Sequence, residues 1–197
     1  DKEVVSLIGS KEGLAHMIMA MAGPGDVVLV PSPGYPVYHN YTLLAGAEPY
    51  VMALKPENKF LPDLQAIPED VARKSKLMFL NYPNNPTGAV YTLAELKAIA
   101  EWAKKHDVWI ISDEIYRRIY YGPGPAPSLL DLPDDLLERT VIIAGASKAY
   151  AMTGWRIGYA AGPAPIIKAM AKVQGQSTSN PTHLAQIATL AALRGPQ

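Results

Sequence analysis

Short apolar runs alternate with longer stretches of helical period along this chain of 197 residues, and that alternation limits the possible folds more than any other feature. The runs are rich in β-branched residues, as buried strands are, and the stretches between them repeat apolar residues every three or four positions. Strands that alternate with helices in this way build a mainly parallel sheet with helices packed on both faces. The sequence therefore predicts an α/β fold with three layers, α/β/α.

The alternation assigns most of the chain to strands or helices. We expect strands at residues 4–8, 27–30, 49–53, 77–80, 108–111, 141–144 and 157–161, the first of which could also be the approach to a turn. We expect helices at residues 11–21, 35–45, 163–173 and 182–193. A further helix should begin after Thr92 and end near His106, because Thr92 and Glu95 have the spacing of a capping box.

Composition places the chain among ordinary globular proteins, since 49% of its residues are hydrophobic and 18% are charged. Basic and acidic residues both number 18, which gives no reason to expect nucleic acid or a membrane surface as a partner. No apolar run approaches the ~20 residues that span a bilayer. The chain has no cysteine, which fits a reducing compartment, and its first residues do not resemble a signal peptide. We therefore expect a cytoplasmic protein. Because the initiating Met is missing, we expect either a segment of a longer protein or a deliberately shortened one.

Three polar segments, at residues 81–88, 112–116 and 147–158, each follow an apolar run. Polar groups at the carboxyl ends of parallel strands converge, because ligands bind in the crevice beyond those ends. The side chains that would meet there are Asn85, Asp113, Tyr116, Lys148 and Arg156. This set suggests a Schiff-base site for a phosphorylated aldehyde cofactor. The four histidines are scattered without metal-ligand spacing, so we predict no metal site.

All three segments, in this order, resemble those of the pyridoxal-phosphate-dependent class I/II aminotransferases of fold type I. The resemblance covers nearly the whole chain and rests above all on the Ser-Lys pair followed by Thr-Gly-Trp-Arg at residues 147–156. It implies a large domain over residues 1–197, with a mixed, mostly parallel seven-stranded sheet that binds pyridoxal 5′-phosphate. It also implies that the amino-terminal segment and the small carboxy-terminal domain of the family are absent. The first half is most similar to LL-diaminopimelate or alanine aminotransferases and the second half to aspartate aminotransferases.

Lys148 is the central residue of this resemblance. A lysine is usually a solvated surface group, and only its context argues otherwise here. The resemblance implies that Lys148 forms the Schiff base and then moves protons as a base. The amine must be neutral to do so, and burial near other cationic groups is expected to lower its pKa.

Asp113, Tyr116 and Asn85 each have a structural alternative. Asp113 could cap a helical turn, Tyr116 could be ordinary packing, and Asn85 could be a turn residue. The resemblance implies that Asp113 pairs with the pyridine nitrogen of the cofactor. It also implies that Tyr116 and Asn85 hydrogen-bond to the phenolate oxygen of the cofactor.

Gly9, Ser10 and Lys11 lie where a strand gives way to a helix, and a helix start offers free amides and a positive dipole end that suit an anion. The resemblance implies that the Ser10 and Lys11 amides hold the cofactor phosphate there. The resemblance adds Arg156 and Ser147 to this site. Arg156 could equally form a surface ion pair. Tyr35 occupies the position of the aromatic side chain that stacks on the cofactor ring, although by itself it could be a surface tyrosine in a turn.

The leading hypothesis is an aminotransferase that moves an amino group between an L-amino acid, such as aspartate or alanine, and a 2-oxo acid through Lys148. The resemblance places the arginine that binds the substrate carboxylate outside this chain, so we expect slow turnover from the segment alone. Two alternatives remain: a truncated cofactor-binding scaffold with little catalysis, and a β-lyase of the same fold. The family also implies a homodimer.

Overall fold

The computed structural model describes residues 2–196, which form one seven-stranded sheet in the order β1-β7-β6-β5-β4-β2-β3. Strands β2 to β6 run parallel to one another, whereas β7 lies antiparallel between β1 and β6. The sheet is therefore mixed and mostly parallel, as expected. The strands are β1 (Val4–Leu7), β2 (Val27–Ser32), β3 (Glu48–Ala53), β4 (Ser75–Asn81), β5 (Trp109–Asp113), β6 (Thr140–Gly145) and β7 (Gly158–Ala161).

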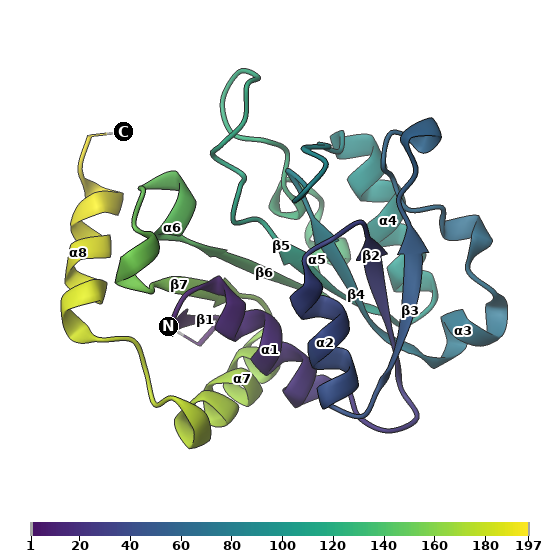
Figure 1. The fold of residues 1–197 in the computed structure, drawn as a ribbon, viewed down its shortest axis with the longest axis horizontal. Coiled ribbons are helices and arrows are strands. Elements are labelled where there is room, and N and C mark those ends of the chain that lie inside the picture. Colours follow the sequence, from purple (N-terminus) through teal and green to yellow (C-terminus); the bar gives the residue numbers. More distant parts are fainter. Residues whose placement is uncertain (1, 197) are drawn as a thin grey trace.

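Helices cover both faces of the sheet (Figure 1). One face packs against α1 (Ser10–Met21), α2 (Pro36–Leu44) and α7 (Ala164–Ser177). The other packs against α3 (Glu69–Lys74), α4 (Leu93–Lys105) and α5 (Asp134–Leu137). The short α6 (Ala146–Ala149) follows β6 directly, and α8 (His183–Arg194) packs on α6 at the end of the molecule. This arrangement confirms the three layers.

The side chains of β4 show why its sequence is a continuous apolar run. Leu77 and Phe79 point into the core beneath α1 and α2, while Met78 and Leu80 point into the core beneath α4. All four are buried, so neither face of the strand calls for a polar residue.

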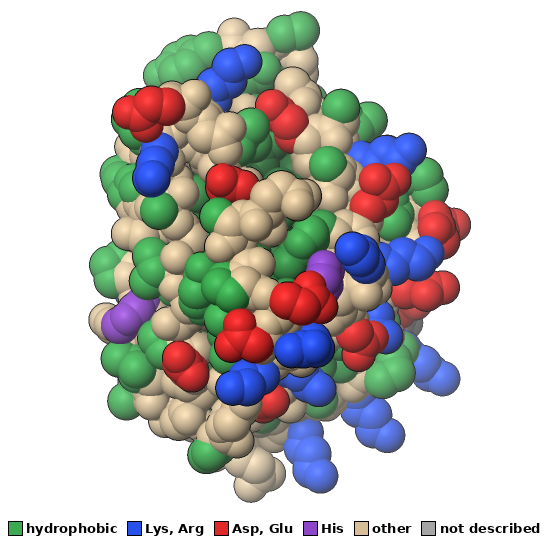
Figure 2. Space-filling view, turned by 90° about the vertical axis from the view of Figure 1, so that its right-hand side faces the viewer, with side chains coloured by type: hydrophobic (Ala, Val, Ile, Leu, Met, Phe, Trp, Pro, Cys, Tyr) green, Lys and Arg blue, Asp and Glu red, His purple; other side chains and the backbone are tan. Residues whose placement is uncertain are grey.

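On the surface, acidic and basic side chains are interspersed on the face shown in Figure 2.

The expected strands and long helices are all present, with ends displaced by a few residues. The capping box of α4 is also confirmed, because Glu95 N–H donates to Thr92 Oγ1 at 3.3 Å and Thr92 N–H donates to Glu95 Oε2 at 2.7 Å. Three short helices, α3, α5 and α6, were not predicted from the sequence. These helices have only four to six residues, too few for a helical period to become visible.

Candidate active site

The carboxyl ends of β4, β5 and β6 open into a cavity of about 330 Å³, within the size range of small-molecule sites. Nine of the ten residues expected to form the site line this cavity: Ser10, Lys11, Tyr35, Asn85, Asp113, Tyr116, Ser147, Lys148 and Arg156. The tenth, Gly9, lies behind Arg156, since a Cβ built on Gly9 would be 2.4 Å from Arg156 Nη2. The structure therefore brings together residues that lie up to 147 positions apart.

At one end of the cavity, which we call the Asp113 end (Asp113, Tyr38 and Asn81), polar groups are buried and paired. Tyr38 donates its hydroxyl hydrogen to Asp113 Oδ2 at 2.7 Å, and Asn81 Nδ2 donates to the Asp113 carbonyl oxygen at 3.0 Å. Burial raises the pKa of the Asp113 carboxyl to about 6, although the hydrogen bond from Tyr38 acts in the opposite direction. Asp113 does not cap a helix, because turns follow β5.

Tyr38 and Asn81 belong to the site but were not predicted from the sequence. Asn81 is the last residue of β4 and stands beside Asp113 in the parallel register of β4 and β5, so a polar residue at a strand end was the available signal. Its Oδ1 also accepts from the Asn85 backbone N–H at 2.8 Å and thus fixes the start of the loop that carries Asn85. For Tyr38 the signal was its place on α2, only three residues after Tyr35.

Tyr116 lies on the segment of residues 115–127. The buried carboxylate of Glu114 holds the two ends of this segment together. Ser128 Oγ lies 2.7 and 2.8 Å from the two carboxylate oxygens, and Ser112 Oγ lies 3.0 Å from one of them. Burial raises the pKa of Glu114, and the hydrogen bonds from Ser128 and Ser112 limit that rise. The carboxylate therefore joins the end of β5 to the far end of the segment.

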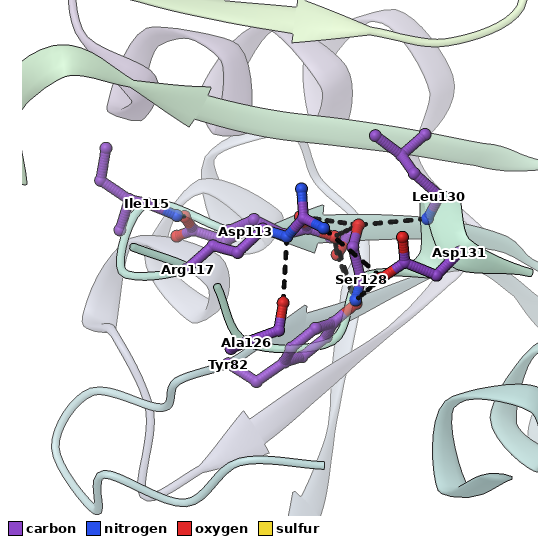
Figure 3. Close-up of polar contacts among 10 residues, drawn as sticks. Tyr82, Asp113, Ile115, Arg117, Ala126, Ser128, Leu130 and Asp131 are labelled. Carbon is purple, nitrogen blue, oxygen red and sulfur yellow. Dashed lines mark hydrogen bonds and ion pairs between the residues drawn. The ribbon is translucent and has the colours of Figure 1, made fainter. Parts of the chain in front are cut away.

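Arg117 also joins the two ends of this segment, as Figure 3 shows. Its Nε donates to the Ala126 carbonyl oxygen at 3.1 Å and lies 3.7 Å from Glu114 Oε2. Its Nη2 lies 3.4 Å from Asp131 Oδ2. Because both ends of residues 115–127 are tied together, Tyr116 projects into the cavity from a fixed base, whereas Tyr121 at the tip is fully exposed.

Lys148 lies on α6, directly after β6. Ala146 and Ser147 form the buried side of this short helix, and Lys148 is exposed at the rim of the cavity. Its Nζ lies 5.7 Å from the centre of the Tyr116 ring. The expectation that Lys148 is buried is therefore wrong.

The opposite end of the cavity, which we call the Arg156 end (Gly9, Ser10, Lys11 and Arg156), is open and basic. Arg156 and Lys11 are exposed, and Arg156 Nη1 donates to the Thr153 carbonyl oxygen at 3.0 Å. Helix α1 begins here without a hydrogen bond from a capping side chain. A Cβ on Gly158 would be 2.6 Å from Ser10 N, so only glycine lets β7 approach this helix start so closely.

These features fit a phosphorylated cofactor with a basic ring nitrogen. The Arg156 end offers a guanidinium, an ammonium and a helix start, which suit a phosphate group. The Asp113 end offers a buried carboxylate, which suits a cationic ring nitrogen. Lys148 lines the same cavity and supplies the primary amine that a Schiff base needs.

The chain matches the family Aminotransferase class I and II across residues 1–197. It belongs to that family. Class I and II aminotransferases depend on pyridoxal 5′-phosphate, and the cofactor expected from the sequence is thereby confirmed at the level of the family.

The chain is similar to class I and II aminotransferases from several bacteria. It is 50% identical over 196 residues to LL-diaminopimelate aminotransferase of Moorella thermoacetica and 43% identical over 196 residues to aspartate aminotransferase of Geobacillus stearothermophilus. These alignments cover 100% and 99% of the chain, but 50% of each relative. The chain therefore spans about half the length of these relatives.

Solved aminotransferase structures share the fold. BacF from Bacillus subtilis superposes with a TM-score of 0.94 at 39% identity, over 99% of this chain and 49% of that one. Aspartate aminotransferase from Thermus thermophilus, a single mutant, gives 0.91 at 41% identity, over 98% and 50%. In this aminotransferase chain, no helix within residues 2–196 is long and apolar enough to cross a membrane.

Proposed function

We propose that the chain is the cofactor-binding large domain of an aminotransferase that moves an amino group between an L-amino acid and a 2-oxo acid. The observation that carries this proposal is the gathering of Lys148, Asp113 and Arg156 around one cavity in a member of a pyridoxal-phosphate-dependent family. We include in the proposal a cytoplasmic location and a homodimer.

Bound pyridoxal phosphate supplies an electron sink for the carbanion at the substrate Cα. Lys148 would hold the cofactor through its primary amine and would act as the base that takes the proton from the substrate Cα. Asp113 is placed to keep the ring nitrogen protonated, and its burial strengthens that pairing by excluding water.

The remaining residues hold the cofactor. Tyr116 and Asn85 would hydrogen-bond to its phenolate oxygen, and Tyr35 would pack on its ring. The phosphate would be held by Gly9, Ser10, Lys11, Ser147 and Arg156, all of which lie in or directly behind the cavity. A charged phosphate is costly to bury without partners. At this exposed end of the cavity the phosphate can pair with Arg156 and Lys11 without being fully buried.

For the substrate we propose an amino acid with a carboxylate in its side chain or at its far end, as aspartate and LL-diaminopimelate have. These are the compounds in the names of the similar proteins from Geobacillus stearothermophilus and Moorella thermoacetica. Alanine remains the alternative with a small side chain.

A second candidate function follows from the open rim of the cavity. Lys148, Thr153 and Arg156 are all exposed within residues 2–196, so the segment by itself offers a substrate few contacts. On this alternative the segment is a cofactor-binding scaffold with little catalysis. A β-lyase would be told apart by its products, because β-elimination releases ammonia whereas transamination exchanges one oxo acid for another.

The test is the absorbance spectrum of the chain with pyridoxal phosphate, before and after borohydride, beside Lys148→Ala. We expect a visible Schiff-base band that borohydride fixes covalently to Lys148 and that the variant lacks. Added aspartate should then bleach the band and release oxaloacetate. An equal band in Lys148→Ala would contradict the assignment of Lys148. A band that no amino acid changes would favour the scaffold.

A further inference from the structure

Helix α1 begins with a contact related to a capping box but displaced by one residue. In a complete box the capping side chain accepts from an amide inside the helix, and a glutamate three residues later accepts from the backbone N–H of the capping residue. Glu12 lies three residues after the capping residue Gly9, but its Oε2 accepts from the Ile8 N–H at 2.7 Å, while the Gly9 N–H donates to the Leu7 carbonyl oxygen at 2.9 Å. The capping side chain is missing, since Gly9 has none.

Helix α4 shows what a complete box looks like in the same chain. Thr92 Oγ1 accepts from the Glu95 N–H while Glu95 Oε2 accepts from the Thr92 N–H. At α1 a glutamate also holds the backbone before the helix, at Ile8 rather than at the capping residue, and no capping side chain covers the amides of Ser10 and Lys11. The turn thus keeps its shape and leaves those amides to a ligand.

The Glu12 carboxylate is itself fixed from a distant helix. Gln174 on α7, which is buried, donates from Nε2 to Glu12 Oε2 at 2.8 Å and to the Ser6 carbonyl oxygen of β1 at 2.8 Å. Thr178 Oγ1 donates to Glu12 Oε1. A free carboxylate this close to a phosphate would repel it, but three donors hold this one back against β1 and α7.

We propose that Glu12 and Gln174 are positioning residues that hold residues 8–11 in the shape that receives the cofactor phosphate. Gln174 ties β1 to the carboxylate, the carboxylate ties Ile8, and the helix start then faces the cavity beside Arg156. This inference rests on the proposed function, because it concerns the phosphate of the same cofactor.

The experiment compares pyridoxal phosphate with pyridoxal, which can form the same Schiff base but has no phosphate. The variants are Gln174→Leu, which removes both donated bonds, and Glu12→Gln, which keeps the size but removes the charge. We expect each to weaken pyridoxal phosphate binding about tenfold, the effect of one lost bond to a charged group. The affinity for pyridoxal should stay within about twofold.

Two matched controls separate this effect from general destabilisation. Glu95→Gln makes the same change in the capping box of α4, and Ser177→Ala removes a contact between α7 and His16 of α1 that does not involve Glu12. Neither control should change the preference for the phosphorylated ligand. Unfolding midpoints of all four variants would show whether each is folded.

The outcomes are distinguishable. If the variants lose affinity for pyridoxal phosphate and pyridoxal equally, or for neither, Glu12 and Gln174 do not position the turn. If the unchanged chain forms no Schiff base at all, the proposed function fails, and inorganic phosphate then becomes the probe. Phosphate should stabilise the unchanged chain against heat more than it stabilises Gln174→Leu, and equal stabilisation would overturn the inference.

Discussion

The two ends of the cavity are built in opposite ways. At the Asp113 end the carboxylate is buried and hydrogen-bonded to Tyr38, while the backbone of the same residue is held by Asn81. At the Arg156 end the basic side chains are exposed and the helix start has no capping side chain. One end is therefore completed by protein atoms, and the other presents donors that a ligand can use.

This difference predicts different consequences of mutation. Buried polar groups that lose a partner cost stability, because nothing replaces the lost bond. Exposed donors are solvated without a ligand, so their loss is felt mainly in ligand affinity. Substitutions at the Asp113 end should accordingly appear in unfolding and in its pH dependence, whereas those at the Arg156 end should appear in cofactor binding.

The largest effect is expected from Gly9→Ala at the Arg156 end. Gly9 has φ +74°, and a Cβ there would be 2.4 Å from Arg156 Nη2, so the guanidinium must move. A displaced charged donor weakens phosphate binding by about tenfold to a hundredfold. Titration of the Schiff-base band with pyridoxal phosphate measures the loss.

Gly25→Ala is the matched control for the backbone strain. Gly25 also has a positive φ, +95°, but nothing lies within 4 Å of its Cβ position. Both variants should lose about 1 kcal/mol or more of stability from the strain. Only Gly9→Ala should lose affinity, and an equal loss in both would show that strain rather than Arg156 is responsible.

The two ends of the cavity also show how much of the site could be predicted from the sequence. Asp113, Lys148 and Arg156 were predicted from strand ends and from the Ser-Lys and Thr-Gly-Trp-Arg pattern, because a parallel sheet gathers whatever follows its strands. Tyr38 and Asn81 at the Asp113 end were not predicted. The burial of each site residue could not be predicted. Asp113 ends β5 and Lys148 follows β6 closely, yet Asp113 is buried and Lys148 is exposed.

Partners from distant segments were also beyond the sequence. Tyr38 is 75 positions from Asp113, and Gln174 is 162 positions from Glu12. Such pairs depend on which helix face packs against which strand, which one sequence without a fold does not state. Short helices such as α6 were missed for the simpler reason that four residues carry no period.

The next effect concerns pH at the Asp113 end of the chain without cofactor. Burial raises the pKa of Asp113 to about 6, while an unfolded aspartate titrates near 4. Between these values the folded chain binds the proton more tightly, so this group makes the free energy of unfolding fall as pH rises from about 4 to about 6. Asp113→Asn should remove that fall, on the order of 2 to 3 kcal/mol, in denaturant unfolding.

Asp135→Asn provides the contrast in sign. The hydrogen bond from Lys104 lowers the pKa of Asp135, so its contribution is present at neutral pH and is lost as pH falls. A change of the same sign in both variants would mean that Asp113 is not titrating as a buried acid.

The smallest effect is expected from Tyr38→Phe, which removes the hydroxyl donor from Asp113 and leaves the ring in its core. The loss should be about 1 to 2 kcal/mol of stability. Because that hydrogen bond lowers the pKa of Asp113, its removal should also move the pH-dependent step to higher pH. Tyr91→Phe removes a hydroxyl bond to the Phe60 carbonyl oxygen and should cost a similar amount without moving the step. If the step stayed in place in Tyr38→Phe, the hydrogen bond from Tyr38 would not affect the pKa of Asp113. The protein would then satisfy the Asp113 carboxylate less well than the geometry of the Asp113 end indicates.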